Sequence, residues 1–273
     1  MTSFDLKSYL QRINYNGDTS PSLQTLNAIT QAHAQAIAFE NVDVILNKRI
    51  YLTDEAIFDK LVTKKRGGYC FEQNALLLQA LTHLGFVAKP LSARVRLRFT
   101  TREPIAPRTH VFVRVEIGGE SFITDVGMGS ASLTGALKLV PDLEQETPHE
   151  VRRIVKEGHI WYHQVRYGDV WQDACEFTLE EMPLIDREIA NWYTSAHPQS
   201  HFKGNIMVSL ALGNGKRLNL HNYDLTVRSR NGDSEKISLK NNNELIEALT
   251  NKFGLNLSAS DREALSSFSV AVV

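Results

Sequence analysis

The spacing of hydrophobic residues changes near residue 87, and this change constrains the fold of the chain more than any other feature. Before it, apolar residues recur every three to four positions, as on one face of an α-helix. After it, apolar and polar residues alternate, which is typical of half-buried β-strands. A helical region followed by many short strands predicts an α+β fold, with an antiparallel meander or small barrel after the helices.

Three helices are expected before the change. Ser20 and Pro21 suit the N-cap and first turn of one helix. Thr53 suits the N-cap of the next, which is expected to end with Gly67 just beyond its last turn. The third helix is expected over residues 70–84, where leucines form the apolar face.

Alternating segments separated by turn residues follow the helices. Gly118-Gly119 joins two of them as a hairpin. In another, Arg94, Arg96 and Arg98 alternate with apolar residues, so we expect these arginines on the solvated face of a strand. Strands are expected at 94–99, 111–117, 121–126, 151–155, 160–167, 170–177, 206–212, 217–221, 224–229 and 235–239. Helices are expected at 243–253 and from 260 to 268.

The composition excludes several classes of protein. The net charge is −1, which indicates neither a nucleic-acid partner nor an anionic membrane surface. Apolar runs are far shorter than the roughly 20 residues of a transmembrane helix. The first seven residues lack the basic-then-apolar pattern of a signal peptide, so we expect a cytoplasmic protein. Its two cysteines, Cys70 and Cys175, are expected to be free thiols in that reducing compartment.

Cys70 is the candidate nucleophile, because it follows a double glycine at the expected start of a helix. Free N–H groups and the helix dipole favour a thiolate there. The dipole contributes about 0.3–1 kcal/mol at an exposed site. An ordinary thiol, with a pKa of about 8.5, needs roughly two pKa units or more to become mostly ionised, at about 1.4 kcal/mol each. The helix end is therefore insufficient, and an adjacent imidazolium is required.

The hairpin supplies that imidazole. If Gly118-Gly119 is a two-residue loop, paired residue numbers add up to 237, so Asp125 lies opposite Phe112. His110 is two positions from Phe112 on the same face, which makes His110 and Asp125 diagonal neighbours. Asp125 can then hold the tautomer of His110 and stabilise its imidazolium. The residues alone therefore predict a Cys70–His110–Asp125 triad for acyl transfer through a thioester.

Other residues are assigned to the core or surface. Cys175 lies in a strand-like run and is expected in the core. His159 and His163 are four apart in a strand, where that spacing does not make two side chains converge, so no metal site is expected.

Residues 66–74, RGGYCFEQN, strongly resemble the signature of the arylamine N-acetyltransferase family, in particular the bacterial arylamine and N-hydroxyarylamine acetyltransferases. Three further motifs match in the same order. They are AFENVDV at 38–44, RTH at 108–110 and DVGMG at 125–129, and TSAHPQSHF at 194–202 is similar to a segment of the bacterial members. The resemblance covers nearly the whole chain, although Ala38 stands where proline is usual and Met128 where phenylalanine is common.

The resemblance implies three domains around a core like that of the cysteine proteases. A helical bundle over 1–86 would carry the nucleophile, an antiparallel β-barrel over 87–188 would carry the histidine and aspartate, and an α/β lid would cover 189–273. It also implies a ping-pong reaction. Cys70 takes acetyl from acetyl-coenzyme A, and an arylamine, an arylhydrazine or the oxygen of an N-hydroxyarylamine then attacks the thioester, as in xenobiotic metabolism.

By the same resemblance Phe39, Val95, Met128 and Phe202 would line the acceptor pocket. The flexible thioether of Met128 replaces a flat ring that would stack on an aromatic amine, so an altered acceptor profile is expected. Glu40 and Arg66 are expected to form a buried ion pair under the active-site helix. No metal is implied, and the protein is expected to be a monomer or a homodimer.

Three alternatives remain open at this point. A papain- or transglutaminase-like enzyme shares the Cys, His, Asp order, and peptide hydrolysis would favour it. An amide synthase would use the same scaffold with another acceptor. A binding module without catalysis is the third alternative, which the complete triad disfavours.

Overall fold

The computed structural model describes residues 4–97 and 99–269, so residues 1–3, Arg98 and residues 270–273 lie outside the described part. Its helical segments are α1 (Leu6–Arg12), α2 (Leu23–Ala36), α3 (Val42–Ile45), α4 (Asp54–Phe58), η1 (Asp59–Thr63), α5 (Cys70–His83), η2 (Gly129–Ala131), α6 (Leu184–Ala196), η3 (Gly213–Gly215), α7 (Asn242–Glu247), η4 (Ala248–Lys252) and α8 (Ala259–Ser266). Its strands are β1 (Phe39–Glu40), β2 (Val87–Val95), β3 (His110–Ile117), β4 (Glu120–Thr124), β5 (Leu137–Lys138), β6 (Gln145–Glu146), β7 (Val151–Glu157), β8 (Ile160–Tyr167), β9 (Val170–Glu181), β10 (Met207–Ala211), β11 (Arg217–His221), β12 (Asp224–Arg228) and β13 (Ser234–Ser238).

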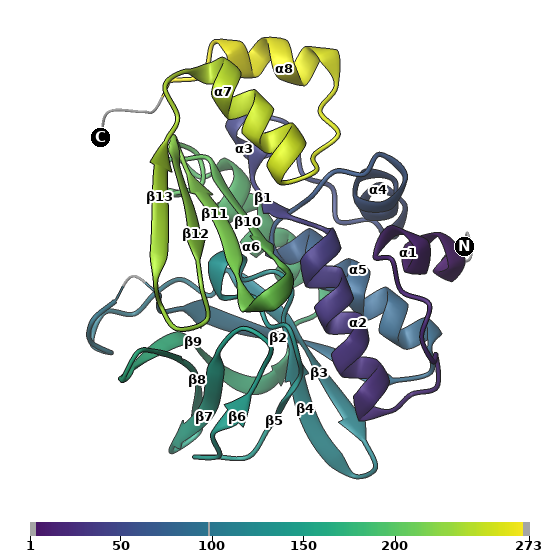
Figure 1. Ribbon diagram of the computed structural model, residues 1–273. Coiled ribbons are helices and arrows are strands. Elements are labelled where there is room, and N and C mark those ends of the chain that lie inside the picture. The colour runs from purple at the N-terminus through teal and green to yellow at the C-terminus, as the bar shows by residue number, and fades with distance from the viewer. Residues whose placement is uncertain (1–3, 98, 270–273) are drawn as a thin grey trace.

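Helices and antiparallel sheets occupy separate regions, as the sequence predicts (Figure 1). One sheet runs β5-β4-β3-β2-β9-β8-β7-β6, and the other runs β1-β10-β11-β12-β13. Helix α5 packs against β2 and β3, and it shares a hydrophobic core with α1, α2 and α4. Helices α7 and α8 lie at the far end of the five-stranded sheet from the eight-stranded one (Figure 1). No helix of the described residues is long and apolar enough to cross a membrane.

The eight-stranded sheet curves into a nearly closed barrel. Its edge strands β5 and β6 do not pair, but one side chain links them. Gln145 accepts a hydrogen bond from the Lys138 N–H at 2.7 Å and donates one to the Lys138 carbonyl at 3.0 Å. The predicted hairpin register is confirmed, since Ile117 pairs with Glu120 and Val113 pairs with Thr124.

Two predicted helix boundaries are wrong. Helix α2 is capped by Ser22 rather than Ser20, because the Ser22 hydroxyl accepts a backbone N–H of the first turn. The helix capped by Thr53 continues from α4 into the π-helical turn η1. Lys65, with φ of 52°, takes the left-handed position expected for Gly67. Gly67 is required for a different reason, since a Cβ there would lie 2.2 Å from a backbone carbonyl oxygen.

The expected solvated row of arginines is also wrong. Strand β2 ends at Val95, and Arg96 is 1% exposed. Its guanidinium donates to the backbone carbonyls of Thr101 and Pro104, and it lies 4.8 Å from the centroid of the Phe99 ring. The segment after β2 thus folds back over Arg96 and offers backbone oxygens to both terminal nitrogens of its guanidinium, which also lies 3.5 Å from the Glu176 carboxylate. Of the predicted row, Arg98 lies outside the described residues.

The five-stranded sheet joins distant parts of the chain. Strand β1, from the N-terminal region, pairs with β10, with Phe39 opposite Ser209. Helix α6 includes both residue 188 and residue 189, between which a domain boundary is expected from the sequence. The division of the chain into domains over 1–86, 87–188 and 189–273 stays a prediction.

Candidate active site

Cys70 is the first residue of α5, and the preceding glycines allow the tight approach of the chain to that helix. The Tyr69 N–H donates to Glu72 Oε2 at 3.1 Å, which binds a free backbone donor at the helix start. A Cβ on Gly68 would lie 2.8 Å from the same carboxylate oxygen. Glycine at 68 therefore lets Glu72 fold back over the turn that precedes Cys70.

His110 and Asp125 come together as the hairpin register predicts. His110 begins β3, and Asp125 follows the last residue of β4. His110 Nε2 lies 2.6 Å from Asp125 Oδ2, and both side chains are buried. With Nε2 engaged by the carboxylate, Nδ1 is the nitrogen left for Cys70, which is one of the groups that raise the pKa of His110.

Asn74 fixes the aspartate and was missed as a functional residue in the sequence, although it belongs to the cysteine motif. Its Nδ2 donates to Asp125 Oδ1 at 2.8 Å, and its Oδ1 accepts the Val126 N–H at 3.0 Å. The Gly127 N–H donates to Asp125 Oδ1 at 2.9 Å. Because Asn74 is four residues after Cys70 on one helix, its side chain lies on the same face, and that spacing is the signal that could have found it.

The buried pair is charged near neutral pH. Burial, the largest single influence, lowers the pKa of His110, but the charge and hydrogen bond of Asp125, with the contact to Cys70, raise it to about 10. Burial raises the pKa of Asp125, yet the His110 charge and its other hydrogen bonds bring that pKa below its ordinary value. An imidazolium beside a thiol stabilises the thiolate form, which is the reactive nucleophile.

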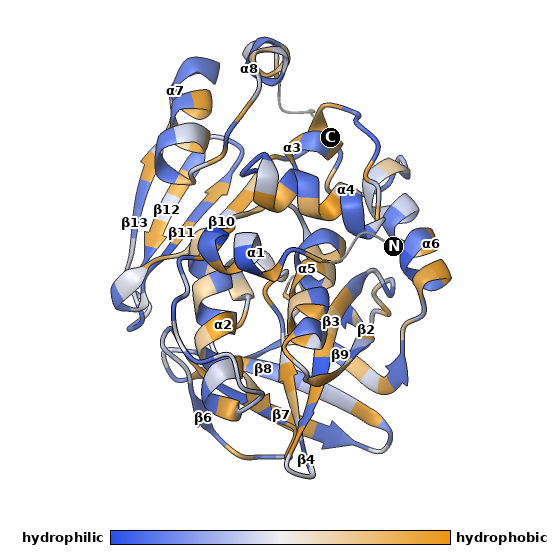
Figure 2. Ribbon diagram, turned by 90° about the vertical axis from the view of Figure 1, so that its right-hand side faces the viewer, coloured by the Kyte–Doolittle hydropathy of each residue, from blue (hydrophilic) through white to orange (hydrophobic). Residues whose placement is uncertain are grey.

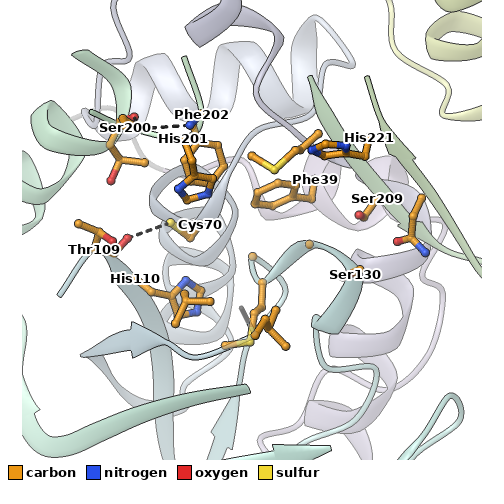
Figure 3. Close-up of a pocket in the computed structure, with 18 of the residues that line it drawn as sticks. Phe39, Cys70, Thr109, His110, Ser130, Ser200, His201, Phe202, Ser209 and His221 are labelled. Atoms are coloured by element: carbon orange, nitrogen blue, oxygen red, sulfur yellow. Dashed lines mark hydrogen bonds between the residues drawn. The ribbon is translucent and has the colours of Figure 1, made fainter. Parts of the chain in front are cut away.

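Cys70 faces a cavity of about 700 Å³. Figure 3 shows its sulfur between Thr109, His110 and His201 at the wall of this cavity, with Sγ 3.7 Å from the Thr109 carbonyl oxygen. Cys70 is nevertheless only 4% exposed. Gly127 closes the floor, since a Cβ there would lie 2.6 Å from Cys70 Cα. The thiol is thus open to a ligand in the cavity and shielded from bulk water.

Phe39, Val95, Met128 and Phe202 all line this cavity together with Cys70 and His110. The Phe39 and Phe202 ring centroids are 6.3 Å apart. Sequence reasoning missed the wall formed by the five-stranded sheet, which includes Ser209, Asn219, His221, Thr226 and Lys236. No local pattern indicates that wall, because it depends on the pairing of β1 with β10.

An ionic network supports the helix start, and the expected Glu40–Arg66 pair is confirmed at 2.8 Å. Arg66 also reaches Asp43 and Asp261, each at 3.2 Å. Lys60 Nζ links Asp43 Oδ2 at 2.8 Å to Glu72 Oε1 at 2.7 Å. Burial lowers the pKa of Arg66, but the neighbouring carboxylates raise it above its ordinary value. Lys48 also pairs with Asp43 and Asp261, so the network joins four carboxylates and three cations beneath the turn before Cys70.

No group of three or more histidine, cysteine or acidic side chains in the described part of the chain could hold a metal ion.

Comparisons with known proteins agree with one another. A family model described as N-acetyltransferase matches residues 22–262. The arylamine N-acetyltransferase of Mycobacterium tuberculosis is 36% identical over 258 residues, covering 93% of this chain and 90% of that protein. The arylamine N-acetyltransferase / N-hydroxyarylamine O-acetyltransferase of Salmonella typhimurium is 35% identical over 257 residues, covering 94% and 90%. The structure of Mycobacterium marinum arylamine N-acetyltransferase in complex with CoA is similar at a TM-score of 0.92, with 35% identity and coverage of 96% and 97%.

Proposed function

This chain belongs to the arylamine N-acetyltransferase family, and on that premise we propose that it transfers acetyl from acetyl-coenzyme A to arylamines and arylhydrazines, and to the oxygen of N-hydroxyarylamines. The observation that carries the proposal is the array of Cys70, His110 and Asp125, in which the buried Cys70 and His110 line a cavity of about 700 Å³. The relative crystallised with CoA supports coenzyme A as the carrier of the acyl group.

In the first half-reaction the Cys70 thiolate attacks the acetyl carbonyl of the donor. The electron pair moves to the carbonyl oxygen and returns as the bond to the coenzyme A sulfur breaks. His110 gives its Nδ1 proton to the departing sulfur, and acetyl-Cys70 remains. Exchange of one thioester for another is nearly isoenergetic, so the chief requirement is a thiolate, and the His110 pKa of about 10 supports one.

In the second half-reaction His110 acts as the base. Acetylation removes the charge of the Cys70 sulfur and its hydrogen bond to the ring, two of the influences that raise the pKa of His110. Neutral His110 takes a proton as the amine nitrogen attacks the thioester carbonyl, and the tetrahedral intermediate expels the Cys70 thiolate. Arylamines are weakly basic and arrive neutral at pH 7, so they need not lose a proton before attack.

Charge on the carbonyl oxygen needs donors in both halves. Cys70 is the first residue of α5, where backbone N–H groups lack intrahelical partners. We assign the Cys70 N–H to this oxyanion hole, since a donor on the nucleophile itself moves with the reacting carbon.

The acceptor would bind among Phe39, Val95, Met128 and Phe202. Phe202 comes from the segment after α6 and packs on Tyr69 with ring centroids 6.0 Å apart. This contact supports a lid role for the C-terminal region, which covers the aromatic ring beside the nucleophile.

Steady-state acetylation assays with varied donor and acceptor test the function. A ping-pong enzyme gives parallel double-reciprocal lines, and coenzyme A release should accompany formation of the N-acetylarylamine. Peptide hydrolysis without such release would favour the papain- or transglutaminase-like alternative. Acyl transfer from longer thioesters with no reaction on acetyl-coenzyme A would favour the amide synthase.

A further inference from the structure

One row of side chains crosses the whole five-stranded sheet on the face that lines the cavity. Pairing places Phe39 opposite Ser209, Ser209 opposite Asn219, Asn219 opposite Thr226, and Thr226 opposite Lys236. Paired residues point to the same face of a sheet, and all five line the cavity. We call these five residues the cross-sheet row. In Figure 3 Ser209 lies beyond Phe39 when viewed from Cys70.

The opposite face of the same strands is the core side. Val208, Leu220 and Leu225 pair with one another there and pack with Leu245 and Leu249 from α7 and η4. Hydrophobic and hydrophilic residues alternate accordingly along β11 and β12 (Figure 2). The hydrophilic side of this alternation therefore forms part of the wall of the active-site cavity.

Asn219 is the unsatisfied member of the row. Its Oδ1 is buried and has no hydrogen-bond partner within the described residues. A buried amide oxygen without a partner is unfavourable, so its occurrence in a side chain that lines the cavity points to a ligand group that donates to it. Ser209, one strand nearer to Phe39, is half-buried beside it.

We propose that the cross-sheet row is a selectivity site for the acceptor, and that Asn219 binds a hydrogen-bonding substituent on the aromatic ring at the end remote from the nucleophilic nitrogen. The proposal rests on the function proposed above. With the ring on Phe39, Ser209 lies one strand away and Asn219 two strands away, roughly 10 Å at the usual strand spacing. A carboxamide para to the amine extends from such a ring along the row, towards Ser209 and Asn219.

The charges favour an acceptor over the phosphates of coenzyme A on this wall. Among the described residues that line the cavity, Lys236 is the one lysine or arginine. It already pairs with Asp224 at 2.8 Å. Phosphate groups are bound by cations free to form charge-assisted hydrogen bonds. A neutral row of serine, asparagine and threonine instead suits a neutral polar substituent.

Discharge of pre-acetylated enzyme by two acceptors tests the proposal. 4-Aminobenzamide carries a remote amide, whereas 4-methylaniline is apolar at that position. The variant Asn219→Leu keeps the branched shape and removes the amide. A neutral hydrogen bond is worth roughly 0.5–1.5 kcal/mol. Asn219→Leu should therefore lower the rate constant for 4-aminobenzamide roughly 2- to 10-fold relative to the rate constant for 4-methylaniline. Ser209→Ala should reduce the ratio of the rate constant for 4-aminobenzamide to that for 4-methylaniline by a smaller factor.

Glu235→Gln is the matched control, since Glu235 is exposed next to Lys236 and points to the opposite face of β13. It should leave the ratio unchanged. An unchanged ratio in Asn219→Leu would overturn the proposal. So would a greater loss in acetylation of the enzyme by acetyl-coenzyme A than in its discharge, because the row would then bind the donor. Failure of the unmodified enzyme to form an acetyl adduct would refute the proposed function itself, and the selectivity site with it.

Discussion

Replacing Asp125 by asparagine should abolish the charge on His110 while keeping its hydrogen bond. The rise in the His110 pKa from 6.5 to about 10 corresponds to about 5 kcal/mol in favour of imidazolium. Asp125 is the largest influence that raises it, and burial opposes it. His163, buried in the barrel and bonded to Arg152 instead of a carboxylate, has a pKa lowered to about 3, chiefly by burial. In Asp125→Asn, His110 should therefore be neutral at pH 7.

The rate of Cys70 alkylation by iodoacetamide between pH 5 and 10 measures the consequence. The unmodified enzyme should react fast at pH 7, because the charged His110 beside the thiol favours the thiolate. An ordinary thiol is only a few per cent ionised at pH 7, so the variant should react roughly 10- to 30-fold more slowly there and recover as the pH rises. Asp169→Asn, in the exposed β8–β9 turn, is the control. A variant with the profile of the unmodified enzyme would refute this electrostatic reasoning.

The same pair makes stability depend on pH. A folded-state pKa above the unfolded value means that His110 stabilises the fold fully below about pH 6.5, and that this contribution is lost as the pH rises to about 10. The unmodified enzyme should lose up to about 5 kcal/mol from this source, at about 1.4 kcal/mol per pH unit. Asp125→Asn should lack this dependence, which urea denaturation at pH 6.5 and 9.5 measures.

Three further substitutions test other parts of the site. Gly127→Ala places a Cβ 2.6 Å from the Cα of Cys70, so it should lower the free energy of unfolding by about 1–3 kcal/mol and remove most of the activity. Gly213→Ala is the control and should change neither, because the space around Gly213 is open. Equal melting temperatures for the two variants would contradict the close contact between Gly127 and Cys70. Glu40→Gln leaves the buried guanidinium of Arg66 with one ion-pair partner fewer, so urea denaturation should show a loss of about 3 kcal/mol in the free energy of unfolding. The exposed Glu235→Gln is the control and should show no loss. A Glu40→Gln variant as stable as the unmodified enzyme would show that the ion pair does not stabilise the fold. Met128→Phe should shift the relative rates across a panel of arylamines and hydrazines towards the flatter rings, and identical relative rates would show that residue 128 does not shape the acceptor pocket.

The sequence predicts the contact between His110 and Asp125 well because its geometry is local. Alternation along the strands and a two-residue Gly-Gly turn fix one register, and that register alone brings His110 to Asp125. The glycines before Cys70 and the helix after it are also local signals. These features need no knowledge of distant contacts.

The parts that the sequence does not predict depend on contacts between distant segments. Arg96 is buried because the following segment folds over it with its carbonyls, which the alternation cannot show. Strand β1 has only two residues and is a strand only because it pairs with β10. No pattern in the neighbouring sequence therefore predicts the cavity wall beyond Phe39. The sequence places the start of the helix capped by Ser22, and the end of the helix before Lys65, a few residues away from their observed positions. Several neighbouring residues suit each cap equally well.

Intact-mass spectrometry after mixing with acetyl-coenzyme A tests the central claim most directly. The account predicts one acetyl group per chain, lost in Cys70→Ala, retained in the matched variant Cys175→Ala, and discharged on addition of an arylamine. Cys175 is the suitable control because it is buried in β9, away from the cavity lining. Absence of the adduct from the unmodified enzyme, or its persistence in Cys70→Ala, would contradict the account.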